Sequence, residues 1–317
     1  MSLDNVLVAT VRKSFWASPE AEVFPHRVYA RVFYAHSTNL LNSLVVFVRA
    51  LAAIALRRPR VVVLGSVERT VPWFIRARRY GLLGRAKLVV TNQLHLSDEQ
   101  LRHVDRNLVY SRAWIERQRP AVRERAVFVP LPADGDLAAA LRAARDGGYV
   151  FTGGGTGRDF ASVIEALRAT DVPLELVTFS RETLGWEGGL PPNVRVGWRL
   201  PVQLFLDRLA GARVVVVPLR SADSDFGQTT LVQALALGRA VVATRSLGIL
   251  DYVEDGREGL LVEAGDVAGY RRAILRLLAD DELRRSCERN ALDRARGSTY
   301  EEFSRRLVDV CGDLAGG

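Results

Sequence analysis

The sequence predicts an α/β protein with two doubly wound domains, and three observations lead to this prediction. Apolar, β-branched runs alternate with helical segments through the N-terminal half. The same alternation returns after a glycine-rich turn at 153–157, and it continues through 214–262 as strand, loop, helix and strand. Such alternation produces parallel sheets covered by helices on both faces. The length of 317 residues allows about two domains.

The N-terminal half contains five strand-like runs separated by helical segments. We expect strands at 5–11, 60–64, 87–91, 107–110 and 126–129, and helices at about 39–57, 71–81, 97–104 and 111–118. The turn-rich segment Pro130 to Gly135 ends this half, and a short helix at 136–145 follows. The expected domains are therefore 1–135 and 148–298.

One apolar run, Leu40 to Leu56, raises the question of a membrane span. Asn42 and Arg49 interrupt it, and it is shorter than the roughly 20 apolar residues that a bilayer requires. A buried helix that leads into the strand at 60–64 explains the run better. The N-terminus has no basic region followed by a long apolar stretch, so no signal peptide is expected.

Charge and cysteine content narrow the classes of function. The net charge is +8, and eight basic residues of the N-terminal half could form a surface for anionic lipid or a phosphorylated acceptor: Arg57, Arg58, Arg60, Arg76, Arg78, Arg79, Arg85 and Lys87. No nucleic-acid-binding module or aromatic stacking platform is found, so a nucleic-acid partner is not expected. Cys287 and Cys311 are too few for a disulfide framework or metal cluster, which suits a reducing cytosol.

The segment 214–262 carries the strongest local signal. The apolar run Val214 to Val217 ends at Pro218 and opens into a polar loop. A helix is expected at 231–237, ended by Gly238, and a second buried strand at 240–244. Ligands of parallel sheets bind outside the carboxyl ends of the strands, and the amides at the head of a helix suit an anionic ligand.

A second ligand-binding signal opens the C-terminal half. The turn 153–157 is glycine-rich, so its backbone amides can approach a phosphate closely. Arg158 follows where the turn meets a helix expected at about 161–169, and its guanidinium can bind phosphate with two hydrogen bonds. The turn alone also resembles a dinucleotide-binding turn, but its spacing departs from G-x-G-x-x-G.

The segment 214–262 resembles the donor-binding region of GT-B glycosyltransferases, especially family 4. The resemblance rests on the motifs at 226–230 (FGQTT), 233–238 (QALALG), 240–244 (AVVAT) and 255–262 (DG followed by GLLV). It implies two Rossmann-like domains that face a cleft, with a C-terminal helix at 299–314 packing back on the first. It also implies transfer of a hexose from a nucleotide-diphosphate sugar to an acceptor hydroxyl, with retention of configuration and without a metal or tightly bound cofactor.

The resemblance assigns donor-binding positions residue by residue. Arg158 matches the arginine that faces the diphosphate, and Gly197 to Arg199 match the loop whose backbone contacts the nucleobase. The full donor-binding set is Gly154, Gly155, Thr156, Arg158, Gly197, Trp198, Arg199, Phe226, Gly227, Gln228, Thr229, Thr230 and Gln233. The chain departs from the family pattern at Gln233, where a glutamate commonly binds the ribose, and it lacks a lysine shortly after Arg158. A glutamine carbonyl can still accept a hydrogen bond, but without charge assistance.

The candidate catalytic residues are less well defined. Asp225, or Ser224, stands near the family's sugar-facing glutamate, and His95 lies close to a histidine that often follows the fourth strand, although it is out of register. No His or Cys spacing indicates a metal site. Two alternatives stay open: another GT-B activity such as a nucleotide-sugar epimerase or a phosphorylase, and a non-catalytic nucleotide- or carbohydrate-binding protein.

The same reading sets expectations for partners and location. The partners are a nucleotide sugar donor and a small-molecule, glycan or lipid-linked acceptor. We expect a cytoplasmic protein, with peripheral contact at the inner face of the membrane as an option that the basic residues allow.

Overall fold

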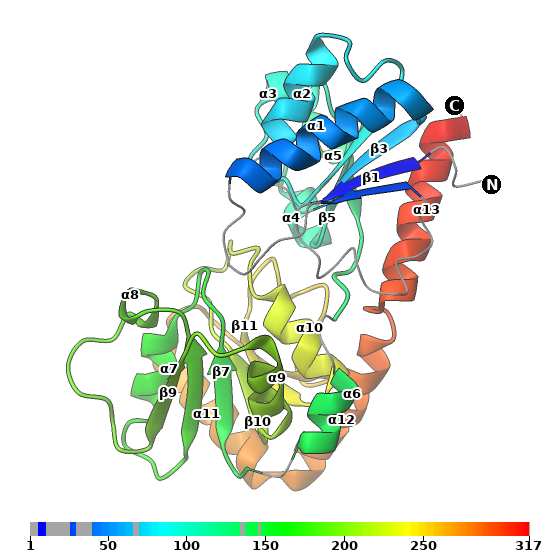
Figure 1. Cartoon of the computed structure of the whole chain (residues 1–317). Coiled ribbons are helices and arrows are strands. Elements are labelled where there is room, and N and C mark those ends of the chain that lie inside the picture. Colours follow the sequence, from blue (N-terminus) through cyan, green and yellow to red (C-terminus); the bar gives the residue numbers. More distant parts are fainter. Residues whose placement is uncertain are drawn as a thin grey trace. The chain divides into compact units, whose positions relative to one another are not determined.

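The computed structural model describes residues 6–10, 26–29, 40–65, 70–133, 137–144 and 147–316. The chain divides into two compact units (Figure 1). Unit 1 comprises Met1–Pro132 with Tyr300–Gly317, and unit 2 comprises Ala133–Thr299. Both are α/β with a six-stranded sheet, which confirms the predicted fold class.

The sheet of unit 1 is parallel throughout, with strand order β2-β1-β3-β4-β5-β6. Its strands are β1 (Val6–Thr10), β2 (His26–Tyr29), β3 (Val61–Gly65), β4 (Lys87–Thr91), β5 (Arg106–Val109) and β6 (Ala126–Phe128). The central strands are continuous apolar runs because helices cover both faces of a parallel sheet.

The helices that the structure describes in unit 1 are α1 (Leu40–Arg57), α2 (Val71–Arg79), α3 (Asp98–Leu101), α4 (Arg112–Glu116), α5 (Pro120–Arg123) and α13 (Tyr300–Gly316). The helices α1 and α2 lie side by side, and the ring of Phe47 packs edge-on against Phe74 with centroids 5.1 Å apart (Figure 1). The last helix of the chain joins this unit, where the carbonyl of Ala315 accepts a hydrogen bond from Arg60 Nη1 at 2.8 Å.

Unit 2 has a parallel sheet with strand order β12-β11-β10-β7-β8-β9. Its strands are β7 (Val150–Gly153), β8 (Leu174–Thr178), β9 (Val194–Trp198), β10 (Val214–Val217), β11 (Ala240–Thr244) and β12 (Gly259–Val262). The chain starts in the middle at β7, runs outward to β9, and returns to β10 on the other side of β7. The strand order therefore reverses between β7 and β10, and this topological switch point is where doubly wound sheets bind ligands.

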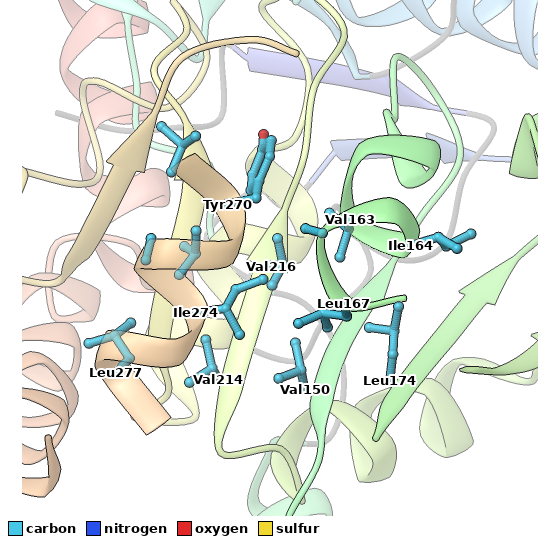
Figure 2. Packing of buried hydrophobic residues seen from close by; sticks show 14 of the residues in the cluster. Val150, Val163, Ile164, Leu167, Leu174, Val214, Val216, Tyr270, Ile274 and Leu277 are labelled. Atoms are coloured by element: carbon cyan, nitrogen blue, oxygen red, sulfur yellow. The ribbon is translucent and has the colours of Figure 1, made fainter. Parts of the chain in front are cut away.

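The helices of unit 2 are α6 (Leu137–Ala143), α7 (Phe160–Leu167), α8 (Arg181–Leu184), α9 (Val202–Ala210), α10 (Gln228–Ala236), α11 (Val267–Ala279) and α12 (Asp281–Ala295). Figure 2 shows the core that α7 and α11 build on one face of the sheet, where Leu167 and Ile274 meet Val214 and Val216. These side chains are fully buried, so the core fixes both helices relative to β7 and β10.

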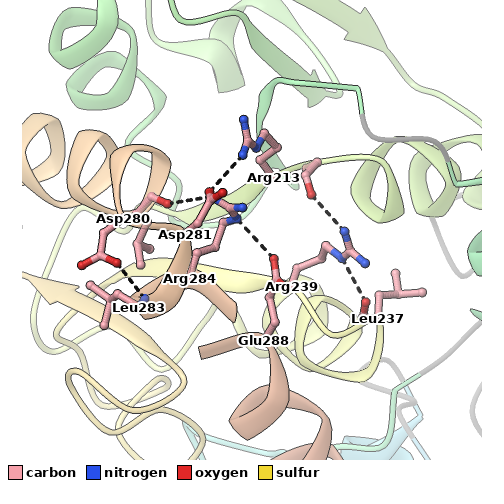
Figure 3. Close-up of polar contacts among 10 residues, drawn as sticks. Arg213, Leu237, Arg239, Asp280, Asp281, Leu283, Arg284 and Glu288 are labelled. Carbon is pink, nitrogen blue, oxygen red and sulfur yellow. Dashed lines mark hydrogen bonds and ion pairs between the residues drawn. The ribbon is translucent and has the colours of Figure 1, made fainter. Parts of the chain in front are cut away.

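Arginines are paired at the amino ends of β10 and β11 and on α12, and one of them links the start of β10 to α12 (Figure 3). Arg284 is buried and pairs with Asp281 and Glu288 on its own helix. Arg213 reaches Asp281 at 3.3 Å, and Arg239 donates to the carbonyls of Leu237 and Ala212. Part of the excess of arginine is thus structural, at the edge of the sheet opposite to the switch point.

The structure corrects several predicted elements. The helix expected at 231–237 begins at Gln228, because Gly227 adopts a left-handed conformation (φ 100°) that ends the loop three residues earlier. The helix expected at 97–104 is only α3, and β2, α5, α8, β9 and α9 were not predicted. Positions 5, 11, 39, 134–136 and 145, at the ends of predicted elements, lie outside the described residues. No helix in the described ranges is long and apolar enough to cross a membrane.

The two cysteines give an independent probe of each unit. Cys311 on α13 and Cys287 on α12 are fully buried, and burial raises the pKa of their thiols to about 12 and about 11. Because the thiolate is the reactive form, we expect neither cysteine to react with iodoacetamide in native protein at about pH 8. Mass spectrometry after alkylation, with unfolded protein as the positive control, checks this; rapid labelling of either thiol in native protein would contradict its burial.

Candidate functional site

The loops that follow β7 and β10 are joined to each other at the switch point of unit 2. Asp159 N donates to the carbonyl of Pro218 at 3.2 Å, and Arg220 N donates to the carbonyl of Gly157 at 3.1 Å. Arg158 and Leu219 form an isolated antiparallel bridge between these contacts. The two loops therefore form one structure, and Arg158 lies at its centre.

The guanidinium of Arg158 is buried but incompletely paired. The residue is 4% exposed, its Nε donates to the carbonyl of Gly153 at 3.0 Å, and its Nη2 donates to Thr230 Oγ1 at 2.9 Å. Its Nη1 has no hydrogen-bond partner among the described residues. Burial lowers the pKa of Arg158 to about 10, so the group stays cationic near neutral pH. An unpaired buried cation is costly, and an anionic ligand would supply the missing partner.

Two glycines leave room for this guanidinium. Gly154 has φ 120°, and a Cβ there would lie 2.8 Å from Arg158 Nε and Nη2. Gly227 has φ 100°, and a Cβ there would lie 3.2 Å from Arg158 Nη1. Both positions thus combine a backbone conformation that favours glycine with close approach of the arginine. Gly154 and Gly227, one from each predicted motif, therefore both make room for the guanidinium of Arg158.

The head of α10 lies directly beside Arg158. Gly227 is its N-cap and has no side chain to bind the first amides, which no intrahelical carbonyl can reach. Thr230, in the first turn, holds Arg158 Nη2. Helix amides and a guanidinium therefore converge at one point, which is the arrangement that binds phosphate at helix N-termini.

A buried hydroxyl pair supports the loop after β10. Thr244 Oγ1 accepts from Leu219 N at 2.5 Å and lies 2.6 Å from the hydroxyl of Tyr270. Burial raises the pKa of Tyr270 to about 12, so its hydroxyl stays protonated. Gly248 also lies against this loop, and a Cβ there would lie 2.5 Å from the carbonyl oxygen of Phe226. Sequence reasoning missed Thr244, Tyr270 and Gly248 as supports of the site.

Aromatic side chains stand at the same carboxyl edge of the sheet. Trp198 ends β9, Phe179 follows β8, and Phe226 precedes α10; all three are exposed. Phe179 was not predicted, although its place directly after a parallel strand was the available signal. Arg199 has φ 49° and donates from its backbone N to Thr178 O and from its Nε to Phe179 O, both at 2.9 Å.

The structure thus places the candidate residues in three groups. The switch point brings together nine of them: Gly154, Gly155, Thr156, Arg158, Phe226, Gly227, Gln228, Thr229 and Thr230. Gly197 to Arg199 lie at the end of β9, two strands from β7. Gln233 lies on α10 and is 5% exposed.

The two candidate catalytic residues belong to different units. His95 is an exposed residue between β4 and α3 of unit 1, and Asp225 lies in the loop before α10 of unit 2. Within the described residues, no group of three or more His, Cys, Asp or Glu could hold a metal ion.

Comparison with known proteins agrees with this geometry. Residues 158–280 match the family described as Glycosyl transferases group 1. D-inositol 3-phosphate glycosyltransferase of Corynebacterium kroppenstedtii is 32% identical over 132 residues, which are 42% of this chain and 29% of that relative. The chain spans less than half the length of the first curated relatives that it matches.

Solved structures match over nearly the whole chain. A glycosyltransferase from Rickettsia africae has a TM-score of 0.70 at 11% identity, covering 98% of this chain and 97% of that one. HepE of Anabaena, in complex with UDP-glucose, has a TM-score of 0.66 at 15% identity, covering 92% and 87%. The two sheets and their connections are therefore those of the GT-B fold. Residues 158–280 of unit 2 are thus similar to the group 1 glycosyltransferases, and the chain has the fold of solved GT-B glycosyltransferases.

Proposed function

We propose that the protein is a glycosyltransferase that moves a hexosyl group from a nucleotide-diphosphate sugar to an acceptor hydroxyl. The observation that carries this proposal is the unpaired Nη1 of Arg158, buried at the switch point beside the head of α10. Negative charge grows on the diphosphate as the sugar leaves. A preorganised guanidinium and helix amides stabilise such charge without reorganising at the moment of reaction.

The donor in this proposal binds unit 2. The diphosphate takes the amides of Gln228 to Thr230 together with Arg158, the nucleobase lies near Gly197 to Arg199, and the ribose contacts Gln233. The exposed aromatic residues at this edge offer a face on which a base can stack. HepE, a structural neighbour, binds UDP-glucose, which supports a nucleotide sugar as co-substrate.

Arg158 and the helix amides supply the charge stabilisation for which other transferases use a metal, so we propose metal-independent transfer with no tightly bound cofactor. Retention of configuration follows from the resemblance to family 4. Asp225 would bind sugar hydroxyls. His95 would be a catalytic residue contributed by unit 1, which we propose as the acceptor-binding domain.

The acceptor in this proposal is a small molecule, a glycan or a lipid-linked glycan, and the protein works in the cytoplasm. The basic residues of unit 1 support a peripheral contact with the inner face of the membrane, and nucleic acid is not among the proposed partners.

The identity of residue 233 supports one alternative function. Gln233 cannot give the ribose the charge-assisted hydrogen bond of a carboxylate, which weakens the donor site and favours a non-catalytic nucleotide-binding protein as second candidate. Binding of a nucleotide sugar without turnover, in the presence of acceptors and without hydrolysis, would favour that candidate over the transferase.

Thermal unfolding with a panel of nucleotides tests the proposed donor site. We expect one of UDP, GDP, dTDP and ADP to stabilise the protein by about 2–3 kcal/mol at roughly a hundred times its dissociation constant. The matching monophosphate is the control, and it should stabilise much less because it lacks the second phosphate. Equal shifts by both would contradict a diphosphate site. If no nucleotide shifts the transition, the proposed function is wrong.

A further inference from the structure

Two adjoining hollows lie at the amino edge of the unit 2 sheet, opposite to the switch point. Their volumes are about 400 Å³ and about 390 Å³. Leu141, Arg239 and Glu288 line both of them, so the two hollows form one groove. Sites for small molecules commonly have volumes of about 300–1,000 Å³. The groove is therefore large enough to hold a small-molecule ligand.

Arginines from three elements line this groove. Arg213 directly precedes β10, and Arg239 directly precedes β11. The other three, Arg284, Arg285 and Arg289, lie on α12. We name the hollow lined by these five residues the arginine groove. Figure 3 shows Arg213, Arg239 and Arg284 near one another at this edge of the sheet.

The positive charge of the arginine groove is only partly neutralised. Glu288 lines the groove, and Asp281 pairs with Arg213 and Arg284 at its rim. Five arginines and these two carboxylates give the groove a formal charge of +3. Like charges held in one hollow repel one another, and an anionic ligand would relieve this repulsion.

The arginines keep hydrogen-bond donors that the protein does not use. A guanidinium has five N–H groups, and among the described residues Arg239 uses only Nε and Nη1, for the carbonyls of Leu237 and Ala212. Arg285 and Arg289 are one turn apart and exposed, and in the described part of the chain their guanidinium groups form no hydrogen bond or ion pair. These three residues line the same hollow, so their free donors can meet on one anion.

Apolar side chains line the same hollow. Leu141 on α6 and Leu292 on α12 are 45% and 49% exposed, and Leu237 lies at the end of α10. An inorganic ion would leave these surfaces in water. A ligand that carries an organic body beside its anionic group would cover them, which favours binding.

The arginine groove is separate from the proposed donor site. The nine-residue helix α10 begins at Gln228, in the donor site, and the residues that follow it, Leu237 and Gly238, line the groove. At 1.5 Å per residue the helix is about 14 Å long. A ligand in the groove would therefore contact the end of α10 that points away from Arg158.

We infer that the arginine groove binds a small organic phosphate as a second ligand of unit 2. The phosphate of a monoester carries about −1.5 to −2 charges at pH 7, so it neutralises more of the groove than a carboxylate does. It would bind Arg239, Arg285 and Arg289, and its organic body would contact Leu141 and Leu292. This ligand is not the nucleotide sugar of the proposed transfer, so the inference does not depend on that function.

Calorimetric titration of the full-length protein with phenyl phosphate tests the inference, because this probe joins a phosphate to an apolar ring. We expect saturable binding that salt weakens, at least about tenfold weaker binding of benzoate, and no binding of phenol. Arg285→Glu with Arg289→Glu should weaken the binding of phenyl phosphate by at least about tenfold. The matched control is Arg272→Glu with Arg276→Glu, two exposed arginines at the same spacing on α11, and it should bind like the unchanged protein.

Two further measurements separate loss of the groove from other causes. Protection of Cys287, which is buried on α12, from alkylation shows that unit 2 of a variant is folded. If the groove variant fails this check, Arg285→Gln with Arg289→Gln replaces it. Arg158→Ala should still bind phenyl phosphate, and the groove variant should keep its nucleotide-induced thermal shift, so failure of the donor site is recognised separately.

Four results would overturn the inference. They are no binding of phenyl phosphate, binding that the groove variant leaves unchanged, equal weakening by both charge-reversed variants, and loss of binding in Arg158→Ala alone. Equally tight binding of benzoate would contradict phosphate as the class of ligand.

Discussion

Replacing Arg158 by alanine is expected to reduce sugar transfer by about 10²–10³-fold, the usual loss when one preorganised donor to developing charge is removed. The reason is the position of Nη1, which is buried without a protein partner where the diphosphate would lie. The variant should also lose the stabilisation by nucleoside diphosphate. The measurement is steady-state transfer or hydrolysis with the nucleotide sugar that the thermal panel identifies.

Two further variants make this result specific. Arg158→Lys keeps a charge but cannot hold Gly153 O, Thr230 and the ligand together, so we expect it to recover only part of the activity. Arg168→Ala, on an exposed arginine paired with Glu165 one turn earlier, removes a guanidinium elsewhere on unit 2 and should leave activity unchanged. Normal transfer by Arg158→Ala would show that the arginine only braces the loops.

The stability of the Arg158 variant needs its own measurement, because two effects oppose each other. Alanine removes the two hydrogen bonds that Arg158 donates to Gly153 O and Thr230 Oγ1, which destabilises the fold, but it also removes a buried, incompletely paired charge. Since the two effects partly cancel, we expect the free energy of unfolding to change by no more than about 1–2 kcal/mol. Loss of activity can then be assigned to the site.

Local patterns predicted the fold class because most of its strands are apolar runs and because glycines mark breaks between elements, such as Gly238 directly after α10. They also found Arg158 and Gly227, since both stand in short motifs. The pairing of Arg158 with Thr230 joins residues 72 positions apart, so only the folded chain reveals which nitrogen of the guanidinium is left over. The sequence could suggest a phosphate-binding arginine, whereas its burial and its unpaired Nη1 are properties of the packing.

The misses also have physical causes. The strand β2 reads HRVY, without the apolar run that marks a central strand, and it lies at the edge of its sheet. The start of α10 reads GQTT, which is polar like a loop, and only the left-handed Gly227 shows where the helix begins. Gly248, Thr244 and Tyr270 act through contacts with residues distant in the sequence, so no local pattern indicates them.

Replacing Gly259 by alanine is expected to destabilise unit 2 by about 3 kcal/mol or more. Gly259 begins β12 and pairs with Val241 in the parallel ladder. A Cβ at this position would overlap the carbonyl oxygen of Val241 and lie 2.6 Å from its Cγ2. Backbone atoms of a central strand cannot move aside, so β12 would have to separate from β11.

The reactivity of the two buried cysteines shows which unit the substitution destabilises. In Gly259→Ala, Cys287 of unit 2 should become reactive toward iodoacetamide at denaturant concentrations that leave Cys311 of unit 1 protected. The matched control is Gly297→Ala in unit 2, where a Cβ would meet only Arg294 O at 3.6 Å and the backbone needs no left-handed conformation. Alanine there should be neutral or slightly stabilising.

The outcome of these two substitutions shows which role Gly259 has in the motif at 255–262. If Gly259→Ala unfolds unit 2 while Gly297→Ala does not, Gly259 serves the close approach of two strands. Its recurrence in the motif then reflects sheet packing and not contact with a ligand. A stable Gly259→Ala protein that has lost nucleotide binding would place Gly259 in the site instead and would contradict the β11–β12 register. The motif thus divides into a part that builds the sheet and a part, around Gly227 and Arg158, that meets the substrate.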